Sequence, residues 1–120
     1  MSAQSDLSIP ISTSTQSMQP LYSEFADDPE MSDLVDLFIA ELDERIKILE
    51  QTFTDHDLEQ LCQLAHQLKG AGGGYGFMPI TDSAAQLEQQ IKTQQAMDNI
   101  EQSFRELVNL CRRATNGSPK

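Results

Sequence analysis

Residues 58–75 read LEQLCQLAHQLKGAGGGY, and this stretch decides the fold. Its apolar and small residues recur at steps of three and four, which is the spacing of one helix face. These residues are Leu58, Leu61, Ala65, Leu68, Gly72 and Tyr75. A seam of this period is typical of a helix in a bundle. We expect the helix to begin near Asp55, where Thr54 and Asp57 resemble a capping box, and to end at Gly76.

The segments on either side show the same helical period. A first helix is expected over residues 29–52, because Asp28 suits the N-cap and Pro29 suits the first helical position. A third helix should open at Pro79, and a fourth near Met97 or Asp98 with a stop at 116–117. Four amphipathic helices with short connections predict an all-α, antiparallel, up-down-up-down four-helix bundle.

The domain organisation follows from where the helical period begins and ends. Residues 1–20 are rich in Ser, Thr, Gln and Pro and predict a disordered or partly ordered tail. Residues 21–115 should form the bundle, preceded at 21–25 by a short extra helical segment that packs through Leu21, Tyr22 and Phe25. Residues 116–120 are expected to be a C-terminal tail.

Composition excludes several classes of function. The chain has 120 residues, which suits one domain, and a net charge of −11, which argues against nucleic acid and anionic membranes. No apolar run approaches the roughly 20 residues of a membrane span, and no signal peptide is evident, so we expect a cytoplasmic protein. Met1 suggests a free-standing module, which we expect to be a monomer. Cys62 and Cys111 predict reduced thiols in or near the core.

Chemistry is concentrated on one face of the second predicted helix. His66, Lys69, Gly70 and Gly73 stand at i, i+3, i+4 and i+7, so they share that face. His66 follows the buried seam position Ala65 by one residue, which places its imidazole at the edge of the buried stripe and open to solvent. A nucleophile that must meet another protein needs this placement.

The glycines and the lysine support the same interpretation. Glycine disfavours a helix, so Gly70 and Gly73 point to close approach by another molecule beyond His66. Gly72 lies on the seam and is better explained by tight helix packing. An ammonium at Lys69, one turn from His66, can stabilise the negative charge of a phosphoryl group.

The run Ala65-His66-x-x-Lys69-Gly70, followed by Gly76, resembles the signature of histidine-phosphotransfer (HPt) domains. The resemblance extends over roughly residues 25–115 in helix order and length. It implies that His66 accepts a phosphoryl group, that Lys69 supports the phosphohistidine, and that Gly70 clears space for an incoming receiver domain. We place Gln67 and Gly73 on the same docking surface. Glu88 falls where the family often has a polar residue facing the histidine helix.

The resemblance implies a phosphorelay carrier rather than an enzyme. Its partners would be response-regulator receiver domains or a hybrid sensor kinase, and the receiver would supply the phospho-aspartate, a Mg²⁺ ion and a lysine. We expect the chain to have no cofactor or metal of its own. Because the sequence has no P-loop and no kinase-type nucleotide motif, we also expect no autophosphorylation.

Two other functions compete with this one. A helical adaptor could use the face of His66, Lys69 and Gly70 purely for contact. A metal-dependent hydrolytic bundle is disfavoured, because no helix offers the Glu-x-x-His pattern of a di-iron site. His56, which we expect in the first turn of the second helix between two aspartates, is interpreted as a surface residue.

Overall fold

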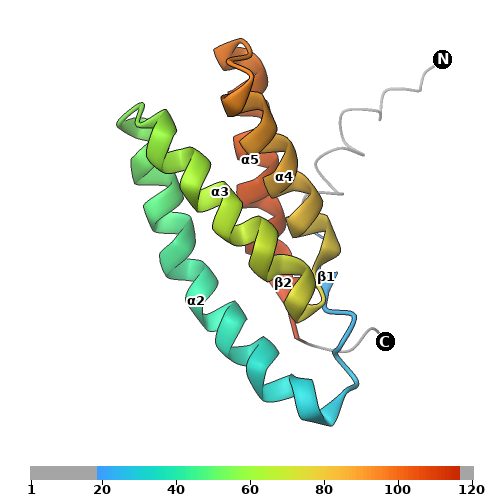
Figure 1. The fold of residues 1–120 in the computed structure, drawn as a ribbon. Helices are drawn as coiled ribbons and strands as arrows, with labels where there is room; N and C mark the ends of the chain where they lie inside the picture. Colours follow the sequence, from blue (N-terminus) through green and yellow to red (C-terminus); the bar gives the residue numbers. More distant parts are fainter. Residues whose placement is uncertain (1–18, 117–120) are drawn as a thin grey trace, which may run out of the picture.

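The computed structural model describes residues 19–116, which form a mostly helical domain of four helices. Figure 1 shows the helices side by side, with both ends of the described chain at the same end of the domain. Their bounds are α2 Pro29–Thr54, α3 Leu58–Gly72, α4 Met78–Lys92 and α5 Met97–Arg113. In this part of the chain, no helix combines the length and apolar character needed to cross a lipid bilayer.

The N-terminus of α2 is the one predicted from the sequence. The Asp28 side chain accepts a hydrogen bond from the backbone N–H of Glu30, and Pro29 occupies the first turn. The helix continues two residues beyond the expected end at Thr52, because Thr54 is still helical. Its buried face includes Val35, Phe38, Leu42, Ile46 and Leu49.

The start of α3 differs from the prediction. The cap is Asp57, whose side chain accepts from the backbone N–H of Gln60, so the helix begins at Leu58 rather than near Asp55. Thr54 belongs to α2, which removes it from any capping role. His56 lies in the turn between the helices with a left-handed φ of 57°, and not in a helical turn. It is exposed, as expected.

The end of the helical stretch lies at Gly76, where the sequence predicts it, although the α-helix itself ends at Gly72. After Gly72 the chain tightens into a 3-10 turn over Gly73–Tyr75 and stops at Gly76, which has a φ of 88°. A side chain at Gly76 would also collide with the segment before α2, because a Cβ there would lie 2.3 Å from Ser23 Oγ. Gly76 is therefore required both by backbone conformation and by close approach.

The extra helical segment predicted at 21–25 is wrong. Leu21–Tyr22 form a short strand, β1, which pairs in parallel with β2, Ala114–Thr115. Residues 24–27 then form turns that lead into α2. A segment this short gains little as an isolated helix, whereas pairing with the end of the chain satisfies its backbone groups.

The chain terminus differs accordingly. The helix α5 ends at Arg113 because Ala114 is extended, with a ψ of 133°. Asn116, which we expected to open a C-terminal tail, donates hydrogen bonds to Asp36 Oδ1 at 2.8 Å and to the Ser32 carbonyl at 3.1 Å. The tail predicted at 1–20 lies outside the described residues except for Gln19 and Pro20, and residues 117–120 lie outside them too.

All four helices contribute buried side chains to one hydrophobic core. Side chains that are almost fully buried include Val35, Leu61, Ala65, Leu68, Leu87, Ile100 and Leu107. Phe77, just after the 3-10 turn, is completely buried and stacks on Phe38 with ring centroids 5.9 Å apart. Each fully buried Leu or Phe contributes roughly 1.5–3 kcal/mol relative to exposure. This packing holds α3 and α4 in a fixed register.

Candidate functional site

His66 projects from α3 at the margin of the core. Its neighbours Ala65 and Leu68 are buried, whereas the His66 side chain is 65% exposed. The helical seam that buries Ala65 turns the next residue by about 100° and leaves it at the rim. The ring can therefore be reached by another protein while its backbone stays anchored in the bundle.

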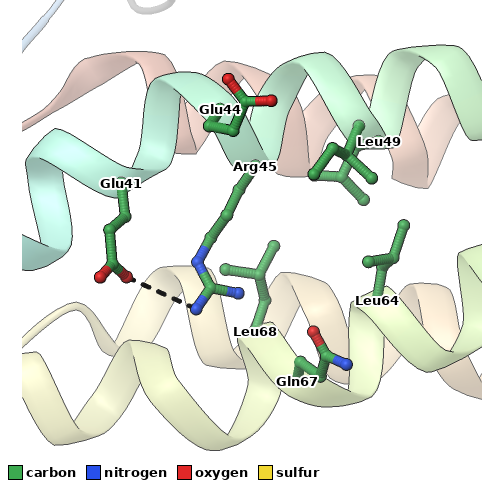
Figure 2. Close-up of a pocket in the computed structure, with 8 residues that line it drawn as sticks. Glu41, Glu44, Arg45, Leu49, Leu64, Gln67 and Leu68 are labelled. Atoms are coloured by element: carbon green, nitrogen blue, oxygen red, sulfur yellow. Dashed lines mark ion pairs between the residues drawn. The ribbon is translucent and has the colours of Figure 1, made fainter.

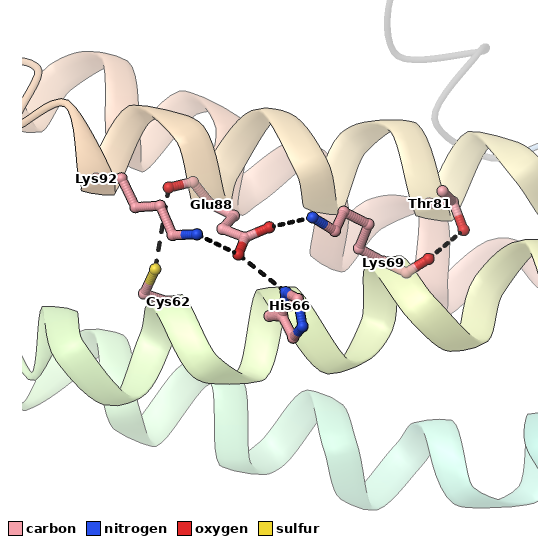
Figure 3. Close-up of polar contacts among 6 residues, drawn as sticks. All are labelled: Cys62, His66, Lys69, Thr81, Glu88 and Lys92. Carbon is pink, nitrogen blue, oxygen red and sulfur yellow. Dashed lines mark hydrogen bonds and ion pairs between the residues drawn. The ribbon is translucent and has the colours of Figure 1, made fainter.

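Glu88 of α4 brings the polar groups of this region together. Its residue is only 4% exposed, yet Oε2 lies 2.9 Å from His66 Nδ1 and Oε1 lies 2.8 Å from Lys69 Nζ. A second lysine, Lys92, places its Nζ 2.9 Å from Oε2. Figure 3 shows the two lysines on opposite sides of the carboxylate, with the His66 ring between them. A buried carboxylate is stable only when it is paired in this way.

The two lysines keep Glu88 ionised. Hydrogen bonds from Lys69 and Lys92 lower the pKa of the Glu88 carboxyl from 4.5 to about 2, against the opposing effect of burial. The interaction acts in both directions, because the Glu88 carboxylate also raises the pKa of Lys92. Glu88 is consequently a carboxylate at any pH near neutrality.

An ionised Glu88 assigns the protons of the His66 ring. A carboxylate can only accept a hydrogen bond, so Nδ1 of a neutral His66 must be the nitrogen that carries the hydrogen. The lone pair is then on Nε2, the ring nitrogen that does not contact Glu88. The ring is thus held in one orientation, with a free lone pair on Nε2 of a side chain that is 65% exposed, which is an arrangement that suits a nucleophile.

Thr81 ties the end of α3 to the start of α4. Its hydroxyl donates to the Lys69 carbonyl at 2.8 Å and accepts from the Gly73 N–H at 2.7 Å. The two bonds satisfy backbone groups that the 3-10 turn leaves without helical partners. They also fix the backbone at Lys69, from which the ammonium reaches Glu88.

The glycines of this helix end fall into two groups. A Cβ added at Gly70 would meet nothing within 4 Å, so the surface beyond His66 is open there as predicted. Gly72 is tightly packed, also as predicted, because a Cβ would lie 2.8 Å from Thr81 Oγ1. Gly73 is half-buried and less open than Gly70. A Cβ there would lie 2.7 Å from Met78 Sδ, so a side chain of α4 borders it, and its place on a docking surface stays a prediction.

Two depressions flank the histidine helix and meet at Gln67, which is exposed. One contains His66 and is lined by Cys62, Gln63, Gln67, Glu88 and Lys92. The other is an apolar groove between α2 and α3, formed by Ile48, Leu49, Leu64 and Leu68 with Glu41, Glu44, Arg45 and Gln67 at its rim. Figure 2 shows this second groove and the ion pair between Arg45 and Glu41, 3.7 Å apart.

Sequence reasoning missed Lys92 and Thr81. The pair Glu88 and Lys92 at i and i+4 was a usable signal, because this spacing places opposite charges side by side on a helix. Thr81 offered no local signal, since its partners belong to another helix. Cys62 and Cys111 are free thiols, and burial raises the pKa of Cys111 to about 12. Residues 19–116 contain no cluster of three or more His, Cys, Asp or Glu side chains that could hold a metal ion.

One comparison with known proteins found a match for this chain. The model of the Hpt domain family matches residues 33–117, which include all four helices from the first turns of α2 onward. Neither the curated proteins nor the solved structures gave a match. The match covers well over half of the chain and includes His66, Lys69, Gly70 and Glu88. The chain therefore belongs to the Hpt domain family.

Proposed function

We propose that this protein is a cytoplasmic phosphoryl carrier of a two-component phosphorelay, with Nε2 of His66 as the acceptor atom. It takes the phosphoryl group from the phospho-aspartate of one receiver domain and passes it to another receiver. The observation that carries the proposal is the hydrogen bond of 2.9 Å between His66 Nδ1 and the ionised Glu88, because it leaves Nε2 as the nucleophile.

The transfer step needs no proton acceptor. The Nε2 lone pair forms a bond to phosphorus while the bond from phosphorus to the aspartyl oxygen breaks, and the aspartate leaves as a carboxylate. Nδ1 keeps its hydrogen, so the phosphorylated ring carries a positive charge that faces Glu88. The buried carboxylate stabilises this charge, and the reverse step returns the ring to its neutral form.

The surroundings of His66 fit a second protein better than a small substrate. Gly70 leaves open space one turn beyond the ring, and Gln67 joins the His66 depression to the apolar groove between α2 and α3. We infer that the receiver covers both regions in one interface, since the groove is continuous with the site. The receiver would bring the Mg²⁺ ion and lysine that the family resemblance implies, and this chain would bring no cofactor.

The proposal includes further properties that the family membership favours. We infer an up-down-up-down order of α2, α3, α4 and α5, which the short connections between them require. We also infer that the chain has no autokinase activity, because the sequence contains no nucleotide-binding motif. The monomer expected from the sequence is part of the same proposal.

The deciding experiment is phosphoryl labelling by a phosphorylated receiver with Mg²⁺. The wild-type chain should gain one acid-labile, base-stable phosphoryl group that maps to His66, and His66→Gln should gain none. His56→Gln is the matched control, because it removes the other histidine, which lies exposed in a turn. Equal labelling of His66→Gln would place the site elsewhere. A wild-type chain that binds the receiver but is never labelled would favour the helical adaptor.

A further inference from the structure

We propose that Lys92 is a positioning residue for phosphoryl transfer, which acts by offsetting the charge of Glu88. The inference rests on the proposed function in assuming that His66 carries the phosphoryl group. It assigns a role to a residue of α4 that neither touches the reacting nitrogen nor belongs to the histidine helix.

Glu88 presents an electrostatic conflict that its neighbours must resolve. Its negative charge stabilises the positive ring of a phosphorylated His66, but the same charge repels the anionic phosphoryl group as it approaches. The carboxylate is buried at 4% exposure, so water screens it poorly on the protein side. Two ammonium groups on one carboxylate leave the cluster with a single net positive charge while the ring is neutral.

The two lysines are not equivalent, because they belong to different helices. Lys69 lies one turn from His66 on α3, so it is the cation that can turn from Glu88 towards a phosphoryl group on the ring. Lys92 lies one turn from Glu88 on α4, and its Nζ shares Oε2 with His66 Nδ1. When Lys69 leaves Oε1, Lys92 remains to neutralise the carboxylate.

Lys92 Nζ and His66 Nδ1 contact the same oxygen of Glu88, Oε2, so Glu88 connects the lysine to the ring. The Lys92 ammonium is at most two hydrogen-bond lengths from His66 Nδ1, the ring nitrogen that keeps its hydrogen. Its contact in the structure is with Glu88 and not with the ring. Its effect on transfer passes through Glu88, and it should vanish when Glu88 carries no charge.

This dependence can be tested without a receiver by using phosphoramidate, a small donor that phosphorylates histidine with release of ammonia. The rate of Nε2-phosphohistidine formation would be measured by NMR for wild type, Lys92→Gln and Lys92→Arg. The Lys92→Gln change would be repeated in a Glu88→Gln background, where the amide oxygen can still accept from Nδ1. Lys47→Gln, which removes an exposed lysine from α2, controls for loss of positive charge, and urea unfolding checks that each variant is folded.

We expect Lys92→Gln to slow phosphorylation about fivefold, the size expected for one partly exposed charge, and Lys92→Arg to restore most of the rate. In the Glu88→Gln background the same change should have little effect. An unchanged or faster rate for Lys92→Gln, or an equal loss in both backgrounds, would overturn the proposal. Failure of phosphorylated receivers to label His66 would instead refute the proposed function, while the phosphoramidate rates would still decide the role of Lys92. A wild-type His66 that phosphoramidate cannot phosphorylate would overturn the proposed role of Lys92, whereas labelling by a receiver decides the proposed function.

Discussion

Nδ1 of His66 lies 2.9 Å from Oε2 of Glu88, although the two residues are 22 positions apart and belong to different helices. The carboxylate is buried and held by two lysines, whereas the ring it orients is mostly exposed. The packing of α3 against α4 therefore decides which ring nitrogen faces the carboxylate and which one is left without it. This relationship links the stability of the bundle to its chemistry.

The first prediction concerns stability and pH. Because the folded pKa of Glu88 is about 2 and its ordinary value is 4.5, folding favours the ionised form. The stabilisation by Glu88 is complete above about pH 4.5 and is lost as the pH falls towards 2. Glu88→Gln should therefore be less stable than wild type at about pH 6, and the difference should shrink at about pH 3. Urea unfolding at both pH values measures this, with Glu106→Gln, an exposed carboxylate of α5, as the control. A difference that is constant with pH would contradict the ion-pair account.

The second prediction concerns the open surface at Gly70. A leucine there would project into the space that we assign to the receiver, since nothing in the chain lies within 4 Å of its Cβ. Gly70→Leu should slow transfer from a receiver by about a hundredfold, the cost of misplacing reacting groups by roughly 1 Å. Phosphorylation of His66 by phosphoramidate should be unaffected. Gly74→Leu is the control, because it is equally open but lies one further turn away. Normal receiver transfer in Gly70→Leu would refute the docking role.

The third prediction compares two glycines of α3. Gly70→Ala should raise the free energy of unfolding by about 0.5–1 kcal/mol, because the site is open and alanine favours a helix. Gly72→Ala should lower it by about 1–3 kcal/mol, because the new Cβ would press on Thr81, whose hydroxyl already bonds Lys69 and Gly73. Denaturant unfolding of both variants measures the contrast. Stabilisation by Gly72→Ala would show that this contact is looser than the structure indicates.

The fourth prediction concerns the apolar groove. Ile48 is 41% exposed at the groove between α2 and α3, so Ile48→Glu should weaken binding of a receiver by about tenfold while the fold persists. Met97→Glu is a matched control, because Met97 is 42% exposed but lies at the start of α5, outside the groove. Titration of each variant with a receiver gives the two affinities. Equal affinities of the two variants would show that the groove takes no part in receiver binding.

Much of the fold could be predicted because helix faces are local properties of the sequence. The seam of α3, the Asp28 cap and the stop at Gly76 each have a signal in neighbouring residues, and the structure has all three. The errors lie in short segments, whose structure depends on partners that are distant in the sequence. Leu21 and Tyr22 pair with Ala114 and Thr115, a contact between the two ends of the described chain that no local pattern reveals.

The candidate site also has features that the sequence predicts and features that it does not. That Lys69 and Gly70 accompany His66 on one face follows from helical geometry, so it could be inferred from their spacing. Gly73 shares that face but is bordered by Met78 of α4, and spacing along α3 contains no information about that contact.

The sequence by itself determined that the chain makes amphipathic helices and that an imidazole, an ammonium and a bare backbone occupy one helix surface. Hydrogen bonds and side-chain directions within a helix repeat with a set period, which is why these features depend only on nearby residues. Only the tertiary structure decided that Glu88 is buried against His66, that Lys92 shares its carboxylate, and that Nε2 is the free nitrogen. Those facts depend on the register of α3 against α4, which is set by the packing of the whole core.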